Sequence, residues 1–231
     1  RQIQSIGDSQ LGVMGPEQVR GLTSQQIRAL KTSQIMALQP EAVAYLQPSN
    51  VLGLESESLK QLASGQLTAL STDAIAAFTS KQISILGTDQ LSSLGTSQIK
   101  ALATSQMPGL STDRLSALGT DALAAFSPVA IRALGFPQLS VLTTEKLSVL
   151  EGAQIAALTT TQLTGLATNL VKLLSPTNVA ALLSSQVSGL VTNALNSWKP
   201  DQIAAVSTAV LGALPAPQFA AFASDQLNAM G

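Results

Sequence analysis

The chain has 231 residues, of which 45% are apolar, 11% charged and 3% aromatic, and its formal net charge is −1. This apolar content excludes a solvated disordered tail, and the near-neutral charge excludes the basic surface by which proteins bind nucleic acids or anionic membranes. Because cysteine and histidine are both absent, disulfide bonds, thiolate or imidazole metal sites and histidine-based catalysis are excluded as well.

An eight-residue repeat runs through the sequence. Counted from Gly7, 28 octads reach Met230, and examples in chain order are TSQQIRAL (23–30), GTDQLSSL (87–94) and TTTQLTGL (159–166). The fifth and eighth places are apolar in every octad, the fourth is Gln in 16, and the second is Ser or Thr in 18 and Pro in 6. We interpret residues 1–231 as a single repeat array. Its start, RQIQSI, lacks Met and lies inside the pattern, so we expect a segment of a longer protein.

The octad spacing selects the backbone conformation. A continuous α-helix turns about 100° per residue, so eight residues leave the apolar stripe about 80° out of register. In a strand, the fifth and eighth places would face opposite sides of the sheet. The remaining solution is a short helix that ends and restarts in every octad.

The residues at the start of each octad are those of a helix N-terminus. Proline suits the first helical position, which makes the second place N1 and the first place the N-cap. Gln at the fourth place completes a capping box, as Gln26 does with Thr23. We also expect first-place glycines such as Gly87 and Gly119 to end the preceding helix in a left-handed conformation.

Charged residues follow the same frame. Ten of the 13 acidic residues stand at the third place and 6 of the 12 basic residues at the sixth. Acids in the first turn and bases near the last turn interact favourably with the helix dipole. The sorting therefore supports one helix per octad.

Such helices must stack, because a helix of about six residues is not stable alone in water. The eighth-place aromatic residues are spaced by multiples of 24 residues: Phe78, Phe126, Trp198 and Phe222. We predict an all-α solenoid of very short helices with three helices per coil. The near-identical octads STDAIAAF (71–78) and GTDALAAF (119–126) would then occupy the same corner, two coils apart.

Regularly placed polar residues are the candidate functional groups. Four aspartates suggest a carboxylate ladder for calcium, but they are spaced by whole octads without further ligands: Asp73, Asp89, Asp113 and Asp121. The fourth-place glutamines suggest a base-reading code, but they vary too little and no basic track accompanies them: Gln82, Gln90, Gln98 and Gln106. We interpret the glutamines as a hydrogen-bonded ladder to helix caps and neighbouring helices, and Trp198 as a core residue. We therefore predict no catalytic, cofactor-binding or metal-binding residues and no enzymatic activity.

The octads TTTQLTGL and GTDQLSSL resemble the tandem Leu-Thr-Thr-x-Gln-Ile/Leu-x-x-Leu repeats of very large secreted or surface-exposed, adhesin-like bacterial proteins. The proline-containing octads QPEAVAYL (39–46) and KPDQIAAV (199–206) are similar to the units of mesothelin-like superhelical ectodomains. The first resemblance implies an extracellular or cell-surface location and an extended helical repeat. It transfers no functional residues, because that group shares no catalytic motif.

These observations favour a structural role. We expect a stalk or spacer of a secreted or cell-surface protein with adhesive or self-associating properties, whose partners are other proteins, further copies or neighbouring repeats of a parent chain. Nucleic acid and membrane insertion are not expected. The alternative is a recognition module whose groove binds a peptide, glycan or protein; Tyr45, the lone aromatic residue at the small seventh place, is the residue that departs from the pattern.

Overall fold

The computed structural model describes residues 3–230 and divides into two compact units, Arg1–Phe126 and Ser127–Gly231. The division falls between two octads, and each unit is described by itself. Every regular element among residues 3–230 is helical, with no strand. The predicted all-α solenoid class is therefore confirmed.

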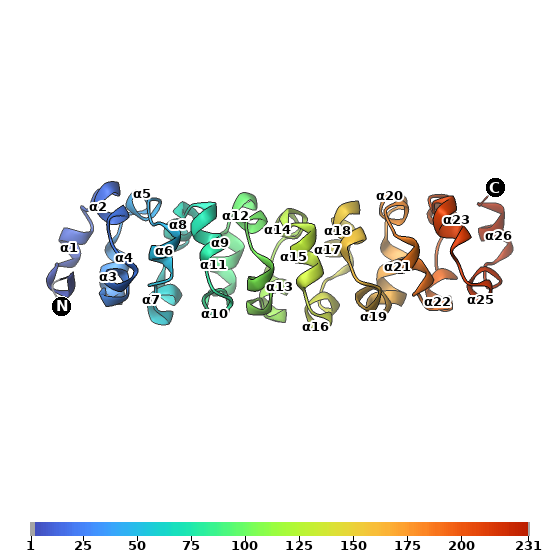
Figure 1. Cartoon of the computed structure of the whole chain (residues 1–231), viewed down its shortest axis with the longest axis horizontal. Helices are drawn as coiled ribbons and strands as arrows, with labels where there is room; N and C mark the ends of the chain where they lie inside the picture. The colour runs from blue at the N-terminus through green and yellow to red at the C-terminus, as the bar shows by residue number, and fades with distance from the viewer. Residues whose placement is uncertain (1–2, 231) are drawn as a thin grey trace. The chain divides into compact units, whose positions relative to one another are not determined.

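The first unit consists of short helices that follow one another along the unit, from the blue to the green part of Figure 1. They are η1 (Ile3–Ser5), α1 (Asp8–Leu11), α2 (Pro16–Arg20), α3 (Ser24–Ala29), α4 (Thr32–Ala37), α5 (Pro40–Val43), α6 (Pro48–Val51), α7 (Ser56–Gln61), α8 (Ser64–Ala69), α9 (Thr72–Ala77), α10 (Ser80–Ile83), α11 (Thr88–Ser93), α12 (Thr96–Lys100), η2 (Thr104–Gly109), α13 (Thr112–Ala117) and α14 (Thr120–Ala125).

The second unit continues in the same manner, with one longer helix. Its elements are α15 (Pro128–Ala133), α16 (Phe136–Ser140), α17 (Thr144–Ser148), α18 (Gly152–Ala157), α19 (Thr160–Leu170), η3 (Val171–Leu173), α20 (Pro176–Ala180), α21 (Ser184–Ser188), α22 (Thr192–Leu195), α23 (Pro200–Ala204), α24 (Thr208–Gly212), α25 (Ala216–Phe219) and α26 (Ser224–Asn228).

Each α-helix begins at the second place of an octad. The preceding first-place residue is an N-cap with extended backbone angles, as in Thr23 (φ −84°, ψ 160°) and Ser71 (φ −64°, ψ 157°), whose hydroxyls accept the N–H of Gln26 and Ala74. Where the second place is proline, the ring stands at N1, which needs no N–H donor. The predicted helix starts are confirmed.

First-place glycines do not take the left-handed conformation that the sequence suggests. Gly87 and Gly119 have φ of −70° and −72°, and no residue of the described chain has a positive φ. In the six-residue helices the eighth-place residue is already extended, as in Leu38 (φ −62°, ψ 128°). Two successive extended residues turn the chain, so a left-handed residue is not needed.

Helices three octads apart pack against each other. In the first unit α9 packs on α12 and α12 on α14; in the second, α19 packs on α22 and α22 on α25. Phe78 directly follows α9 and Phe126 directly follows α14, so the two related octads stand in one column, two coils apart. The prediction of three helices per coil is confirmed within each unit.

The fifth and eighth places form the core. Among the side chains that the structure describes, every fifth-place residue from Leu11 to Ile203 is buried. Most eighth-place residues are buried too, including Phe78, Phe126 and Trp198. Burial of each such side chain contributes roughly 1.5–3 kcal/mol, so each octad supplies two apolar contacts that its short helix cannot make alone.

The small seventh-place residues allow the chain to approach a neighbouring backbone closely. A Cβ atom on Gly53 or Gly109 would overlap the carbonyl oxygen of Ser24 or Ser80, respectively, each 29 residues earlier. This contact lies between backbone atoms, which have little freedom to move apart. Close approach at the seventh place, expected from the sequence, is thus observed at these positions.

The octad of residues 103–110 winds more tightly than the α-helical octads. Residues 104–109 form the 3-10 helix η2, and Pro108 lies inside it. Proline has no N–H, and its ring clashes with the carbonyl four residues earlier in an α-helix. The octad keeps its capping bond, from the Ala103 N–H to Gln106 Oε1 at 2.7 Å, so the proline changes the winding without displacing the helix start.

The prediction of one helix per octad is wrong at one place. Helix α19 runs for 11 residues from Thr160 through the octad boundary to Leu170 and is followed directly by η3. The second of these octads has Ala167 and Leu170 at its first and fourth places, and neither side chain can cap a helix. Loss of the cap allows a helix to continue across an octad boundary but does not force it to do so. Helix α22 still starts anew, although its N-cap residue, Val191, has no capping side chain.

Glycine-to-alanine substitutions test the close approach. Gly53→Ala should destabilise the protein by about 1–3 kcal/mol, because the new methyl group overlaps a backbone carbonyl. Gly65→Ala, inside α8, should stabilise it by roughly 0.5–1 kcal/mol, because the nearest atom to its Cβ is Pro40 Cγ at 3.9 Å and alanine favours the helix. Urea denaturation measures both; equal effects would contradict the assigned packing.

Candidate functional site

The fourth-place glutamines form the most regular polar feature of the fold. Gln98 is 6% exposed, and its Oε1 accepts the N–H of its own N-cap residue, Gly95, at 3.0 Å. Its Nε2 donates to the carbonyls of Leu67 and Leu70, 31 and 28 residues earlier, at 3.0 and 2.7 Å. One side chain thus joins the start of its own helix to the end of an earlier one.

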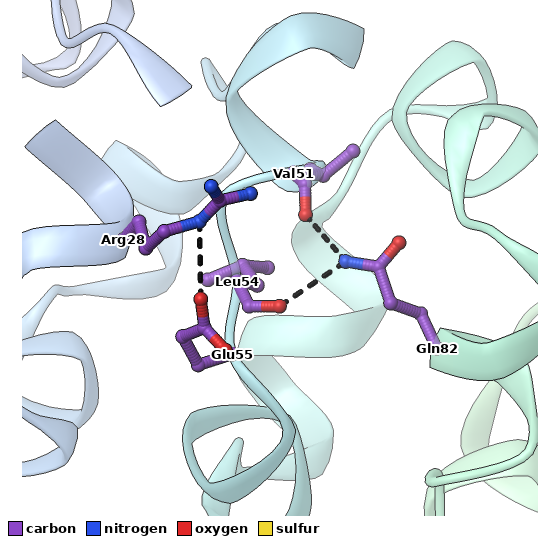
Figure 2. A network of polar contacts seen from close by, with 5 residues as sticks. All are labelled: Arg28, Val51, Leu54, Glu55 and Gln82. Atoms are coloured by element: carbon purple, nitrogen blue, oxygen red, sulfur yellow. Dashed lines mark hydrogen bonds and ion pairs between the residues drawn. The ribbon is translucent and has the colours of Figure 1, made fainter. Parts of the chain in front are cut away.

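The same bridge recurs in both units. Figure 2 shows the Gln82 amide nitrogen directed at the carbonyls of Val51 and Leu54, at 2.8 and 3.2 Å. Seven other glutamines also donate to both carbonyls: Gln34, Gln66, Gln90, Gln98, Gln106, Gln186 and Gln226. The hydrogen-bonded ladder predicted from the sequence is confirmed.

The bridge satisfies backbone groups that short helices leave unpaired. The first N–H groups and last C=O groups of a helix have no partner within it, and in a helix of four to six residues these are most of its polar groups. Helix α8 packs on α5, and Gln66 of α8 donates to Leu38, which directly precedes the α5 octad. Within each unit, the ladder therefore fastens a coil to the one before it.

Other side chains replace glutamine in some octads. Asn50 donates to the carbonyl of Leu22, and Asn178 Nδ2 donates to that of Leu150 at 2.8 Å. Arg114 Nε donates to the carbonyl of Leu86 at 2.7 Å, again 28 residues earlier. Any side chain that can donate to the carbonyl 28 residues earlier forms this bond. The ladder therefore depends on the position of the donor and not on one residue type.

Two buried polar atoms in the second unit have no hydrogen-bond partner: Trp198 Nε1 and Gln218 Oε1. The amide oxygen of Gln218 lacks a partner for a local reason. The N-cap residue of its octad is Pro215, and proline has no N–H to donate to the amide oxygen. Gln218 Nε2 nevertheless donates to the carbonyl of Leu190, at 2.5 Å. Trp198 is 3% exposed, which confirms its assignment to the core.

Apart from the half-buried Arg114 and Lys146, the charged residues of the described chain are exposed. Arg28 Nε lies 3.0 Å from Glu55 Oε1 (Figure 2), and both side chains are more than half exposed. Exposed pairs of this kind contribute at most about 1 kcal/mol. The aspartates considered for calcium are all exposed: Asp73, Asp89, Asp113 and Asp121. Within residues 3–230, no group of three or more acidic, His or Cys side chains is placed to hold a metal ion.

Hollows on the second unit are lined mainly by hydroxyl and apolar groups. One of about 590 Å³ includes Thr143, Thr144 and Lys172. Another, of about 550 Å³, lies beside Phe136 and is lined by Thr160, Thr161, Thr164 and Gly165. Neither set contains the paired carboxylates or activated nucleophile that would indicate catalysis.

Phe136 is the surface residue that sequence reasoning missed. It is 48% exposed, and its ring lies so close to Gly165 that a Cβ atom there would overlap it. The sequence does distinguish this residue, because Phe136 is the sole aromatic residue at the second place of any octad. Tyr45, which the sequence did single out, is 43% exposed in the first unit.

The fold and the ladder define the chain as a tandem-repeat α-helical protein. A family model described as ALTTAQ repeat matches residues 51–88. No curated protein matches the chain. Within the described residues, no helix has the length and apolar character needed to cross a membrane.

Substitution of a buried bridge tests the ladder. Gln98→Ala should destabilise the protein by about 2–4 kcal/mol, because two buried carbonyl bonds and one partly buried N–H bond are lost. The exposed Gln18, whose amide oxygen accepts the Gly15 N–H at 2.8 Å, is the control, and its replacement by alanine should cost less than about 1 kcal/mol. Chemical denaturation distinguishes the two, and equal costs would show that the interhelical bonds are not stabilising.

A second substitution isolates the donor. Gln98→Glu retains the acceptor for the Gly95 N–H but places a carboxylate against two carbonyls, which it cannot bond. The variant should be less stable than the wild type at neutral pH. The difference should shrink as the pH falls, because a protonated carboxyl group can donate to one carbonyl. A difference that grows on acidification, measured by parallel denaturation curves, would contradict this geometry.

Pro215→Thr should repair the unsatisfied amide oxygen. Threonine supplies the missing N–H and a hydroxyl that can cap α25, together worth about 1–2 kcal/mol, against a loss of roughly 0.4–1 kcal/mol of proline rigidity. We expect a net increase in thermal stability. Pro200→Thr is the control, because Pro200 stands at N1, where no acceptor lacks a donor; an equal gain there would refute the explanation.

Proposed function

We propose that this chain is a structural spacer, a stalk-like region of a secreted or cell-surface protein with adhesive or self-associating properties. The observation that supports this proposal is that the regularly placed polar residues form hydrogen bonds that hold the fold together. Hydroxyls cap helices, and amides fasten one coil to the next. The proposal assigns no catalytic, metal or cofactor site to the chain.

The location rests on the resemblance of the octads to repeats of secreted and surface bacterial proteins. It is tested by treating intact cells that express the parent protein with a protease and following this segment with an antibody. Cleavage of the segment in intact cells is expected. Full protection, together with cleavage after lysis, would contradict a surface location.

The spacer role predicts tolerance to removal of a whole coil. Deletion of residues 71–94 removes three octads and leaves Gln98 opposite the carbonyls of Val43 and Leu46, so the ladder can form again. We expect a folded protein with the same helix content per residue by circular dichroism, because each coil contacts only its neighbours.

The matched control is deletion of residues 87–90, which is half an octad. This deletion shifts the apolar fifth and eighth places of all later octads by half a repeat relative to the earlier octads. This variant should lose cooperative unfolding within the first unit. If the two deletions disrupt folding equally, the octads of residues 71–94 have individual roles and are not interchangeable with other octads.

The alternative is a recognition module, and the exposed Phe136 beside the threonine-lined hollow favours it. An aromatic face next to hydroxyl groups offers stacking and hydrogen bonding to a glycan, peptide or protein. Screening on glycan and peptide arrays tests this function. Saturable binding that is abolished by Phe136→Ala and retained in Tyr45→Ala would favour recognition over the spacer.

A further inference from the structure

Two hollows of the second unit adjoin at α19. One lies between α16 and α19, beside Phe136, and the other reaches from α17 to η3, beside Lys172. The walls of both include Gly165, so the hollows are neighbours on the surface. Their volumes, about 550 and 590 Å³, are typical of ligand pockets. A ligand of two or more linked rings can therefore occupy both.

The first hollow contains an aromatic ring that is held in place. Because Gly165 has no Cβ, the Phe136 ring lies directly against its backbone, and a Cβ atom there would come within 2.5 Å of Phe136 Cε2. The residue nevertheless remains 48% exposed. Aromatic rings favour contact with apolar surfaces, and a sugar ring has one face made of C–H groups. The Phe136 ring is therefore suited to stack against a sugar.

Hydroxyl groups in both walls have already used their hydrogen atoms. Thr160 donates to the carbonyl of Ser185 at 3.2 Å, and Thr164 donates to that of Thr160 at 2.8 Å. Ser140 donates to a carbonyl of its own helix at 2.9 Å. Since a hydroxyl has a single hydrogen, these oxygens can only accept from a ligand. Sugar hydroxyls can donate to them, whereas a free carboxylate ion cannot.

The second hollow adds a positive charge. Lys172 is the sole charged residue among the described residues that line either hollow. Its side chain is exposed, and Thr143 and Thr144 belong to the same wall. Glu145, which follows Thr144 in the chain, is exposed and lies outside both linings. Charge complementarity therefore favours a ligand with a negative group at this end.

From these contacts we infer that the adjoining hollows bind an acidic oligosaccharide. One sugar ring stacks on Phe136, and the carboxylate of a linked uronic acid lies against Lys172. This inference rests on the alternative function, recognition, and names its class of ligand. A peptide fits less well, because residues 3–230 contain no sheet edge that could pair with it and Phe136 is the sole aromatic residue of the described walls.

A matched pair of ligands tests the recognition of the carboxylate. The full chain is titrated calorimetrically with hexasaccharides of hyaluronan, of unsulfated chondroitin and of galacturonic acid, and with the same compounds after reduction of their carboxyl groups to alcohols. At least one acidic form should bind saturably and about fivefold more tightly than its reduced form, as expected for an exposed ion pair. Added salt should diminish this difference.

Substitutions separate the two contacts. Phe136→Ala should weaken binding of the acidic and the reduced forms alike, by about tenfold, because both lose the stacking surface. Lys172→Gln should weaken only the acidic form, to the level of its reduced counterpart. Lys100→Gln is the control, because Lys100 also stands at a sixth place and lines a hollow, but one that includes Asp121 and no aromatic residue. It should leave both affinities unchanged.

Other results would overturn the inference in distinguishable ways. If the reduced forms bind as tightly as the acidic ones, or Lys172→Gln weakens both equally, the carboxylate is not recognised; the inference fails and recognition stands. Binding of an array peptide that depends on Phe136, without binding of any of these oligosaccharides, has the same consequence. If no glycan or peptide binds, recognition fails together with the inference, while the spacer role is still tested by the coil deletion.

Discussion

A helix of four to six residues cannot satisfy its own backbone, and this constraint organises the whole chain. Most of its N–H and C=O groups have no partner within the helix. The fourth-place amide meets the need at both ends, accepting from one N-cap and donating to carbonyls 28 and 31 residues earlier. The paired fifth- and eighth-place side chains supply the apolar burial. Neither contribution suffices alone, because unpaired buried polar groups would offset the gain from burial.

Variation at the fourth place shows how much freedom the ladder allows. Asparagine and arginine maintain the 28-residue bond, while five octads have alanine there. Three of these alanines stand in octads whose eighth residue is aromatic: Ala74, Ala122 and Ala194, with Phe78, Phe126 and Trp198. These aromatic residues are all buried, so these three octads, which lack an amide bridge, bury a larger apolar side chain.

The departures from regularity each have a local cause. Pro108 tightens its helix into a 3-10 turn, and Pro215 leaves the amide oxygen of Gln218 without a donor. Helix α19 crosses an octad boundary where neither the first nor the fourth residue can cap. None of these changes alters the packing of helices three octads apart, which continues on both sides of α19. A ladder of many small contacts tolerates the loss of single ones.

The sequence by itself determined the octad, the helix starts and the buried fifth and eighth places, because capping and burial depend on residues that are close in the chain. The spacing of the eighth-place aromatic residues by multiples of 24 also indicated three helices per coil. Only the tertiary structure decided which carbonyls each amide reaches, since a bond across 28 residues depends on how the coils stack. It also decided that Gly87 and Gly119 stay extended, because two extended residues already turn the chain. The exposed Phe136 over Gly165 likewise depends on packing across 29 residues, which no local pattern specifies.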